Sequence, residues 1–100
     1  MARNTTFSMF FYVYVLESKK DHKIYIGYTK NLRKRIEEHN KGLNTSTKLR
    51  APFKLIYFEG CVKEKDAKRR ERYLKTTQGR KFLGLRIREY NRSKKLGSEC

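Results

Sequence analysis

Side chains suited to phosphate chemistry are concentrated between positions 25 and 39. Tyr25 belongs to a segment that alternates like a β-strand, and Gly27 leaves room beside it. Asn31 is a favoured helix N-cap, and Arg35 lies one turn before His39 in the helix that would begin there. A phenol, a guanidinium and an imidazole would then converge over one small area, which suits a phosphate group. Taken singly, each has a plainer interpretation as a packed or a solvated side chain.

Glu71 is the side chain that would turn a basic binding module into an enzyme. It lies in the middle of the apolar face of a helix expected over residues 63–76. A carboxylate drawn toward a core needs a cation, because an unpaired buried charge is very costly. Two alternatives remain open at this point: a structural ion pair with Arg35 or Arg70, or a hard divalent metal completed by waters and a substrate phosphate.

The elements that must position these side chains are a few strands and helices. The expected strands are residues 9–16, 23–28 and 53–59. The first is apolar on both faces and is predicted to be central, with the second as its antiparallel neighbour across a polar loop. The expected helices follow Asn31, span 63–76, and run from 80 to about 90 after an interruption at Gln78 and Gly79. The inward stripe of the first helix is expected to be Leu32, Ile36, His39 and Leu43.

The length of 100 residues, without an internal repeat, predicts a single α+β domain over residues 8–91, between a loose tail at 1–7 and a flexible basic tail at 92–100. Cys61 and Cys100 are far apart in sequence, so neither a disulfide framework nor a metal pair is indicated. The apolar runs are too short to cross a bilayer and the N-terminus does not resemble a signal peptide, so we expect a cytoplasmic protein without a membrane partner.

The charge balance predicts a polyanionic partner. The chain has 26 Lys and Arg against 10 Asp and Glu, and residues 63–95 alone hold 14 basic and 4 acidic residues. Nucleic acid is favoured over a membrane surface, because the helices in this region lack a broad apolar face. The loop at 42–52 carries hydroxyl and basic side chains and is either a phosphate contact or a simple connector. The residues expected to contact nucleic acid are Gly27, Tyr28, Lys30, Lys48, Arg50, Arg70, Lys75, Arg80 and Lys81.

The order and spacing of several short motifs resemble a known family. The chain contains Val13-Tyr14-Val15, then Tyr25-Ile26-Gly27, then Asn31-Leu32, Arg35, His39 and Glu71. This ordered set is similar to a stand-alone GIY-YIG nuclease domain, of the small kind related to the N-terminal domain of excinuclease C, over about residues 10–90. The resemblance implies a small three-stranded antiparallel sheet flanked by about three helices, and metal-dependent cleavage of nucleic-acid phosphodiesters.

The resemblance also implies roles for five residues of the site: Tyr14, Tyr25, Arg35, His39 and Glu71. Hydrolysis needs a base for the water, neutralisation of charge on the phosphoryl oxygens and help for the leaving alkoxide. We expect Arg35 to stabilise the phosphoryl oxygens and Glu71 to hold Mg²⁺ or Mn²⁺ beside the leaving oxygen. Tyr25 or His39 would take the proton, and the sequence leaves both open, because a tyrosine with a pKa of about 10 needs help that a histidine does not.

Three positions depart from the family pattern. Val13 replaces the glycine of the first half-motif, Tyr28 stands where excinuclease-type members carry a lysine, and residues 72–90 contain no asparagine. The sequence therefore predicts a DNA endonuclease, with DNA favoured over RNA, acting as a monomer or weak dimer. The alternatives are a non-catalytic nucleic-acid-binding module of the same fold and an accessory protein of a repair or RNA complex.

Overall fold

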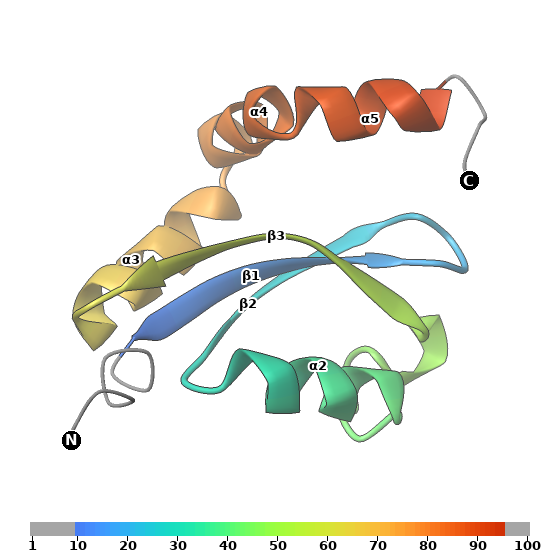
Figure 1. The fold of residues 1–100 in the computed structure, drawn as a ribbon, viewed down its shortest axis with the longest axis horizontal. Coiled ribbons are helices and arrows are strands. Elements are labelled where there is room, and N and C mark those ends of the chain that lie inside the picture. Colours follow the sequence, from blue (N-terminus) through green and yellow to red (C-terminus); the bar gives the residue numbers. More distant parts are fainter. Residues whose placement is uncertain (1–9, 96–100) are drawn as a thin grey trace, which may run out of the picture.

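The computed structural model describes residues 10–95, which form a small sheet with helices on both faces (Figure 1). The strands are β1 (Phe11–Ser18), β2 (Ile24–Thr29) and β3 (Phe53–Cys61). The helices are α2 (Leu32–Asn40), α3 (Glu64–Leu74), α4 (Thr77–Arg86) and α5 (Arg88–Lys95), with a 3-10 turn at Lys48–Arg50. The predicted three-stranded antiparallel sheet is confirmed, and within residues 10–95 four helices accompany it where about three were expected.

The central strand separates two apolar layers. The strand order is β2-β1-β3, with both neighbours antiparallel to β1, so the prediction of a buried central first strand is confirmed. Val13 and Val15 point into a core shared with α3 and α4, whereas Tyr14 and Leu16 point into a second core beneath α2. The alternation of apolar residues along β1 thus supplies both cores, because successive side chains of a strand face opposite sides.

A bulge lets β3 take part in both layers. Tyr57 is opposite Val15 and Leu55 is opposite Leu16, so Ile56 is an extra residue with no partner of its own. Leu55 packs in the layer under α2, while Ile56 and Tyr57 both pack in the layer under α3 and α4. A bulge changes the face of every later side chain, which strict alternation along residues 53–59 did not predict.

The break between α3 and α4 lies earlier than expected. α3 ends at Leu74, and Thr76 caps α4 by accepting a hydrogen bond from the Gly79 amide at 3.0 Å. The prediction that Gly79 interrupts the helix was wrong, because Gly79 lies within the first turn of α4. A Cβ atom there would lie 1.9 Å from the carbonyl oxygen of Tyr73, so the glycine allows the two helices to meet closely.

The last helix is attached to the far end of β1. Glu17 is 3% exposed and accepts hydrogen bonds from the Tyr90 hydroxyl and the Lys94 ammonium. These contacts hold α5, which is helical to Lys95 and so continues past residue 91, where the sequence pattern was expected to end. None of the helices within residues 10–95 is long and apolar enough to span a membrane.

Candidate active site

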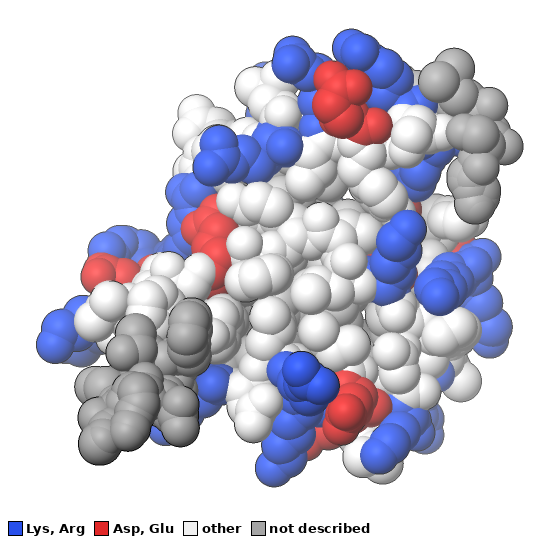
Figure 2. All heavy atoms as spheres, in the orientation of Figure 1, with Lys and Arg blue, Asp and Glu red and all other residues white. Residues whose placement is uncertain are grey.

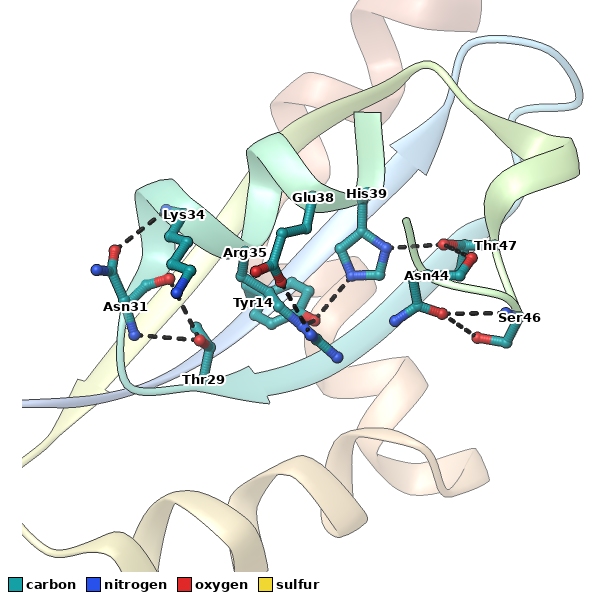
Figure 3. A network of polar contacts seen from close by, with 10 residues as sticks. All are labelled: Tyr14, Thr29, Asn31, Lys34, Arg35, Glu38, His39, Asn44, Ser46 and Thr47. Carbon is teal, nitrogen blue, oxygen red and sulfur yellow. Dashed lines mark hydrogen bonds and ion pairs between the residues drawn. The ribbon is translucent and has the colours of Figure 1, made fainter. Parts of the chain in front are cut away.

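The phenol of Tyr14 is the centre of a polar network between β1 and α2 (Figure 3). Its oxygen lies 3.0 Å from Nε2 of His39 and accepts a hydrogen bond from Nε of Arg35 at 3.4 Å. Tyr14 is 1% exposed, and its ring meets the His39 ring edge-on at 5.8 Å. A phenol, a guanidinium and an imidazole thus come together as expected, but Tyr14 on β1 supplies the phenol that contacts both other groups, in place of Tyr25.

Gly27 makes this placement of Tyr14 possible. The two residues are opposite one another in the β1–β2 ladder, and a Cβ atom at Gly27 would lie 2.3 Å from the Tyr14 hydroxyl. The prediction that Gly27 leaves room for Tyr25 was wrong, because the strand register places the Tyr14 ring across the glycine. Tyr25 is half-buried and packs its ring against that of His39 at 5.1 Å.

Arg35 is presented by the first turns of α2. Asn31 caps this helix, as predicted, by accepting a hydrogen bond from the Lys34 amide at 3.1 Å. Nη1 of Arg35 pairs with Glu38 at 3.2 Å, and 36% of the Arg35 side chain is exposed. The guanidinium therefore contacts the buried phenol at Nε while its far end reaches solvent, where a phosphate could approach.

His39 is buried and held at both ring nitrogens. It is 0% exposed, and its Nδ1 lies 2.8 Å from the hydroxyl of Thr47, which is itself 1% exposed. Burial, and then the positive charge of Arg35, hold the pKa of His39 below its ordinary value, so the imidazole is neutral at pH 7. Leu43, expected on the same inward stripe, is 69% exposed because α2 ends at Asn40, and that prediction was wrong.

Sequence reasoning missed Thr47 as part of the site. The loop at 42–52 was noted for its hydroxyl groups, but nothing in its pattern indicated which hydroxyl faces inward. The nearest signal in the sequence is that Thr47 is a polar residue a few positions after the end of the helix that carries His39.

The electrostatics around Tyr14 keep its phenol protonated. Burial raises the pKa of Tyr14 and the contact with Arg35 opposes the increase, with the nearby Tyr25 and Glu71 side chains adding to it. Hydrogen bonds and ring contacts join Tyr14, Tyr25, Arg35 and His39 on the α2 side of the sheet. Glu71 extends from α3, which packs on the other face of the sheet, and acts on Tyr14 only through its charge.

Glu71 itself has a different partner from either one expected. Its carboxylate pairs with Lys75, one turn later on α3, at 3.0 Å, and 22% of the side chain is exposed. The predicted structural pairs were wrong, because Arg35 is engaged by Glu38 and Arg70 by Glu59. Ala67 and Leu74, one turn before and one turn after Glu71 on α3, are fully buried, so the Glu71 side chain extends from the edge of the packed face.

The family resemblance implies a divalent metal, which would need oxygen or nitrogen donors from this chain. Within residues 10–95, no group of three His, Cys, Asp or Glu side chains is arranged to hold a metal ion. As a metal ligand, Glu71 would therefore be a single carboxylate donor. Such a donor fits Mg²⁺ or Mn²⁺, which commonly binds through one or two carboxylates with waters and substrate phosphates completing its shell.

Two arginines expected to contact nucleic acid lie beside carboxylates of the same chain. Arg70 makes paired hydrogen bonds to Glu59 at 2.9 and 3.1 Å and lies over the Phe82 ring at 4.5 Å. Arg50 has Nε and Nη2 shielded from solvent, with Nε 3.5 Å from Asp21 in the β1–β2 turn. Arg70 thus has a carboxylate partner, whereas Nε and Nη2 of Arg50 make no hydrogen bond within residues 10–95, and a phosphate contact by either residue stays a prediction.

Most of the other residues expected to contact nucleic acid are more accessible, but Gly27 is buried. Lys30, Lys48, Lys75, Arg80 and Lys81 are exposed, although Lys75 is paired with Glu71. Tyr28 donates to Glu64 at 2.5 Å, which together with burial raises the pKa of Tyr28 to about 12. An open hollow of about 380 Å³ lies beside Arg35, and its walls are formed by Tyr28, Thr29, Lys30, Asn31, Lys34, Arg35 and Glu38.

The positive side chains surround a less charged middle on one face of the molecule (Figure 2). On this face Lys and Arg gather over α4, α5, α2 and the loops, whereas the region crossed by β3 is largely uncharged. The basic surface is therefore distributed around the sheet, as expected for a partner larger than a single phosphate.

Known proteins resemble this chain in sequence and in structure. Residues 10–84 match the family described as the GIY-YIG catalytic domain. The chain is 40% identical to a UPF0213 protein of Clostridium perfringens, over 85% of this chain and 96% of that one, and 39% identical to a UPF0213 protein of Staphylococcus saprophyticus, over 74% and 90%. The solution NMR structure of a UPF0213 protein from Bacillus halodurans aligns with a TM-score of 0.53 and 30% identity, over 91% of this chain and all of that one. The chain thus belongs to the GIY-YIG catalytic domain family.

Proposed function

We propose that this protein is a metal-dependent endonuclease that hydrolyses phosphodiester bonds, with DNA preferred over RNA. The observation that carries the proposal is the double contact of the Tyr14 oxygen, with Nε of Arg35 at 3.4 Å and Nε2 of His39 at 3.0 Å. A pure binding surface has no use for a buried phenol joined to a neutral imidazole. A hydrolase does, because the attacking water must lose a proton while charge grows on the phosphoryl oxygens.

Arg35 is the residue that binds the reacting phosphate in this proposal. Its exposed guanidinium end would form charge-assisted hydrogen bonds to the phosphoryl oxygens, exchanging the exposed Glu38 pair for a more strongly charged partner. The Nε contact to Tyr14 remains available during this exchange, because a guanidinium has five donors in a fixed geometry. The substrate is thereby aligned with the phenol beneath it.

The Tyr14 and His39 pair provides the route for the proton. His39 is fully buried and Tyr14 is 1% exposed, so the attacking water would have to reach the phenol past the partly exposed Arg35 side chain, and His39 would receive its proton through the phenol. Tyr14 would pass its proton to Nε2 of His39 as it takes one from the attacking water. The neutral state of His39, favoured by burial, is the state that can accept a proton. Tyr25, half-buried against the His39 ring, then orients the water and substrate at the open side.

Glu71 is the residue that would hold the divalent metal, and when bound that metal would supply Lewis-acid stabilisation of the leaving oxygen. The carboxylate must then be shared with or released by Lys75, whose ammonium is half-exposed and can move into solvent at little cost.

The test compares the purified protein with branched, single-stranded and duplex DNA and with RNA, each with and without Mg²⁺ or Mn²⁺. We expect metal-dependent cuts that disappear in Arg35→Ala, Tyr14→Phe and Glu71→Ala. Arg33→Ala is the matched control, because Arg33 is an exposed arginine on the same helix and its loss changes the charge equally. Binding without cutting by the wild-type protein on every substrate would favour the non-catalytic binding module instead. Loss of cutting in Tyr25→Phe with full activity in Tyr14→Phe would move the base to Tyr25.

A further inference from the structure

The His39 ring is fixed from both sides, by Tyr14 at Nε2 and by Thr47 at Nδ1. We propose that Thr47 is a positioning residue that fixes His39 in the tautomer with hydrogen on Nδ1 and so keeps Nε2 free to accept the proton of Tyr14. This inference rests on the function proposed above, because it specifies how the proton acceptor of that site is prepared.

The hydrogen bonds run in one consistent direction when Thr47 donates to a backbone carbonyl. The Thr47 hydroxyl lies 3.5 Å from the carbonyl oxygen of Asn44, which can only accept and so offers the hydroxyl proton a partner. Its oxygen then accepts from Nδ1–H of His39 at 2.8 Å. Nε2 carries no hydrogen and accepts from the hydroxyl of Tyr14 at 3.0 Å. The Tyr14 oxygen in turn accepts from Nε–H of Arg35.

The opposite arrangement leaves a buried donor unsatisfied. With hydrogen on Nε2, the Tyr14 oxygen would accept from both His39 and Arg35, and its own proton would need another acceptor. Within residues 10–95 the Tyr14 hydroxyl has no hydrogen-bond partner other than those two. The cost of an unsatisfied buried donor favours the other tautomer by about 5-fold to 150-fold.

The loop is built to present Thr47 inward. Asn44 accepts hydrogen bonds from the amide and hydroxyl of Ser46 at 3.0 and 2.7 Å, which closes the turn. The Thr47 amide donates to the Asn44 carbonyl at 3.1 Å, which closes a four-residue turn from Asn44 to Thr47. Thr45 and Ser46 inside that turn are exposed, whereas Thr47 is buried. The inward direction of Thr47 is therefore set by local hydrogen bonds and does not depend on a substrate (Figure 3).

The tautomer can be measured without any nuclease assay. Long-range ¹H–¹⁵N NMR spectra distinguish Nδ1–H from Nε2–H in a neutral histidine. We expect the Nδ1–H tautomer of His39 in the wild-type protein. Thr47→Ser keeps the hydroxyl oxygen and should keep this tautomer. Thr47→Val keeps the shape of the side chain but removes the hydroxyl, so the Nδ1–H form should no longer be the single form. Thr45→Val is the matched control and should leave the His39 signals unchanged. Nε2–H in the wild-type protein, or an unchanged Nδ1–H form in Thr47→Val, would overturn the proposal.

A second arm connects the tautomer to the reaction. Cleavage should fall at least tenfold in Thr47→Val and recover in Thr47→Ser, within the range of about 10² to 10⁴ that positioned acid–base groups contribute. Full activity in a Thr47→Val protein whose tautomer has changed would show that the preparation of His39 is irrelevant to cleavage. If the wild-type protein does not cleave at all, the NMR result still decides the role of Thr47, so failure of the two proposals can be told apart.

Discussion

Tyr14 and Gly27 occupy one space between two strands: a Cβ atom at Gly27 would lie 2.3 Å from the Tyr14 oxygen and 2.5 Å from the ring carbon Cζ. The residues are paired across β1 and β2, so the register of the hairpin sets this distance. The glycine of the second half-motif is therefore a steric requirement of the tyrosine in the first.

Gly27→Ala should displace the Tyr14 ring and abolish cleavage. Because the ring is buried and rigid, we also expect a loss of about 1–3 kcal/mol in the free energy of unfolding, as for overpacking in a core. Gly84→Ala is the control, because a Cβ atom at Gly84 meets nothing within 4 Å and a helix interior favours alanine over glycine by about 0.5–1 kcal/mol. Urea midpoints and cleavage rates of both variants test this, and normal activity in Gly27→Ala would refute the steric account.

Glu71→Gln should have little effect on folding. The carboxylate is partly exposed and pairs with Lys75 on the surface of α3, and such pairs contribute about 0.3–0.5 kcal/mol. A buried structural pair would instead cost about 3–5 kcal/mol to break. We expect urea midpoints of wild type and Glu71→Gln to agree closely without metal, and Mn²⁺ to raise only that of the wild type. A large loss independent of metal would show that Glu71 serves the fold.

Arg70 and Lys81 should separate stability from binding. Arg70→Gln breaks the paired bonds to Glu59, so we expect about 1.5–3 kcal/mol less stability, the usual range for hydrogen bonds to a charged group. The salt dependence of DNA binding should not change. Lys81→Gln removes an exposed cation, so stability should be kept while the salt slope falls by about 1 if Lys81 contacts a phosphate. Equal salt slopes in wild type and Lys81→Gln would remove Lys81 from the interface.

Glu17 should make the protein sensitive to acid. Burial alone would raise the pKa of Glu17, but hydrogen bonds from Lys94 and Tyr90 together outweigh it and hold the pKa below its ordinary value. A carboxyl with a lowered folded-state pKa adds stability above its unfolded value of about 4.3, and this stability is lost as pH falls through the folded value. Urea midpoints of wild type should therefore fall below about pH 4.3, and those of Glu17→Gln should fall less. Glu37→Gln, at an exposed position, should follow the wild type.

The sheet could be predicted because each of its signals is local. Apolar residues on both faces of residues 11–18 require cover on two sides, and the polar loop that follows fixes an antiparallel neighbour. The N-cap at Asn31 is equally local, since side chain and amide are three residues apart. The extra residue at Ile56 was not predictable in this way, because a bulge depends on how two strands are aligned across space.

The candidate site was harder for the same reason. Periodicity along the sequence places Arg35 and His39 on one side of a helix, but the tyrosine that they touch is selected by strand register. The partner of Glu71 was sought among distant arginines although a lysine stood four residues away, at the spacing at which helical side chains meet. Thr47 carries no pattern at all, because its inward direction depends on one turn of loop structure.

The open edge of β3 has a consequence for the behaviour of the protein in solution. Among the described strands, β3 pairs only with β1, and its long outer edge crosses the least charged part of the surface. Such edges join other chains unless something keeps the copies apart, and a net charge of +16 does so through mutual repulsion. Nucleic acid that neutralises this charge also removes the repulsion. Turbidity should therefore peak near charge-matched mixing ratios and clear again when either component is in excess.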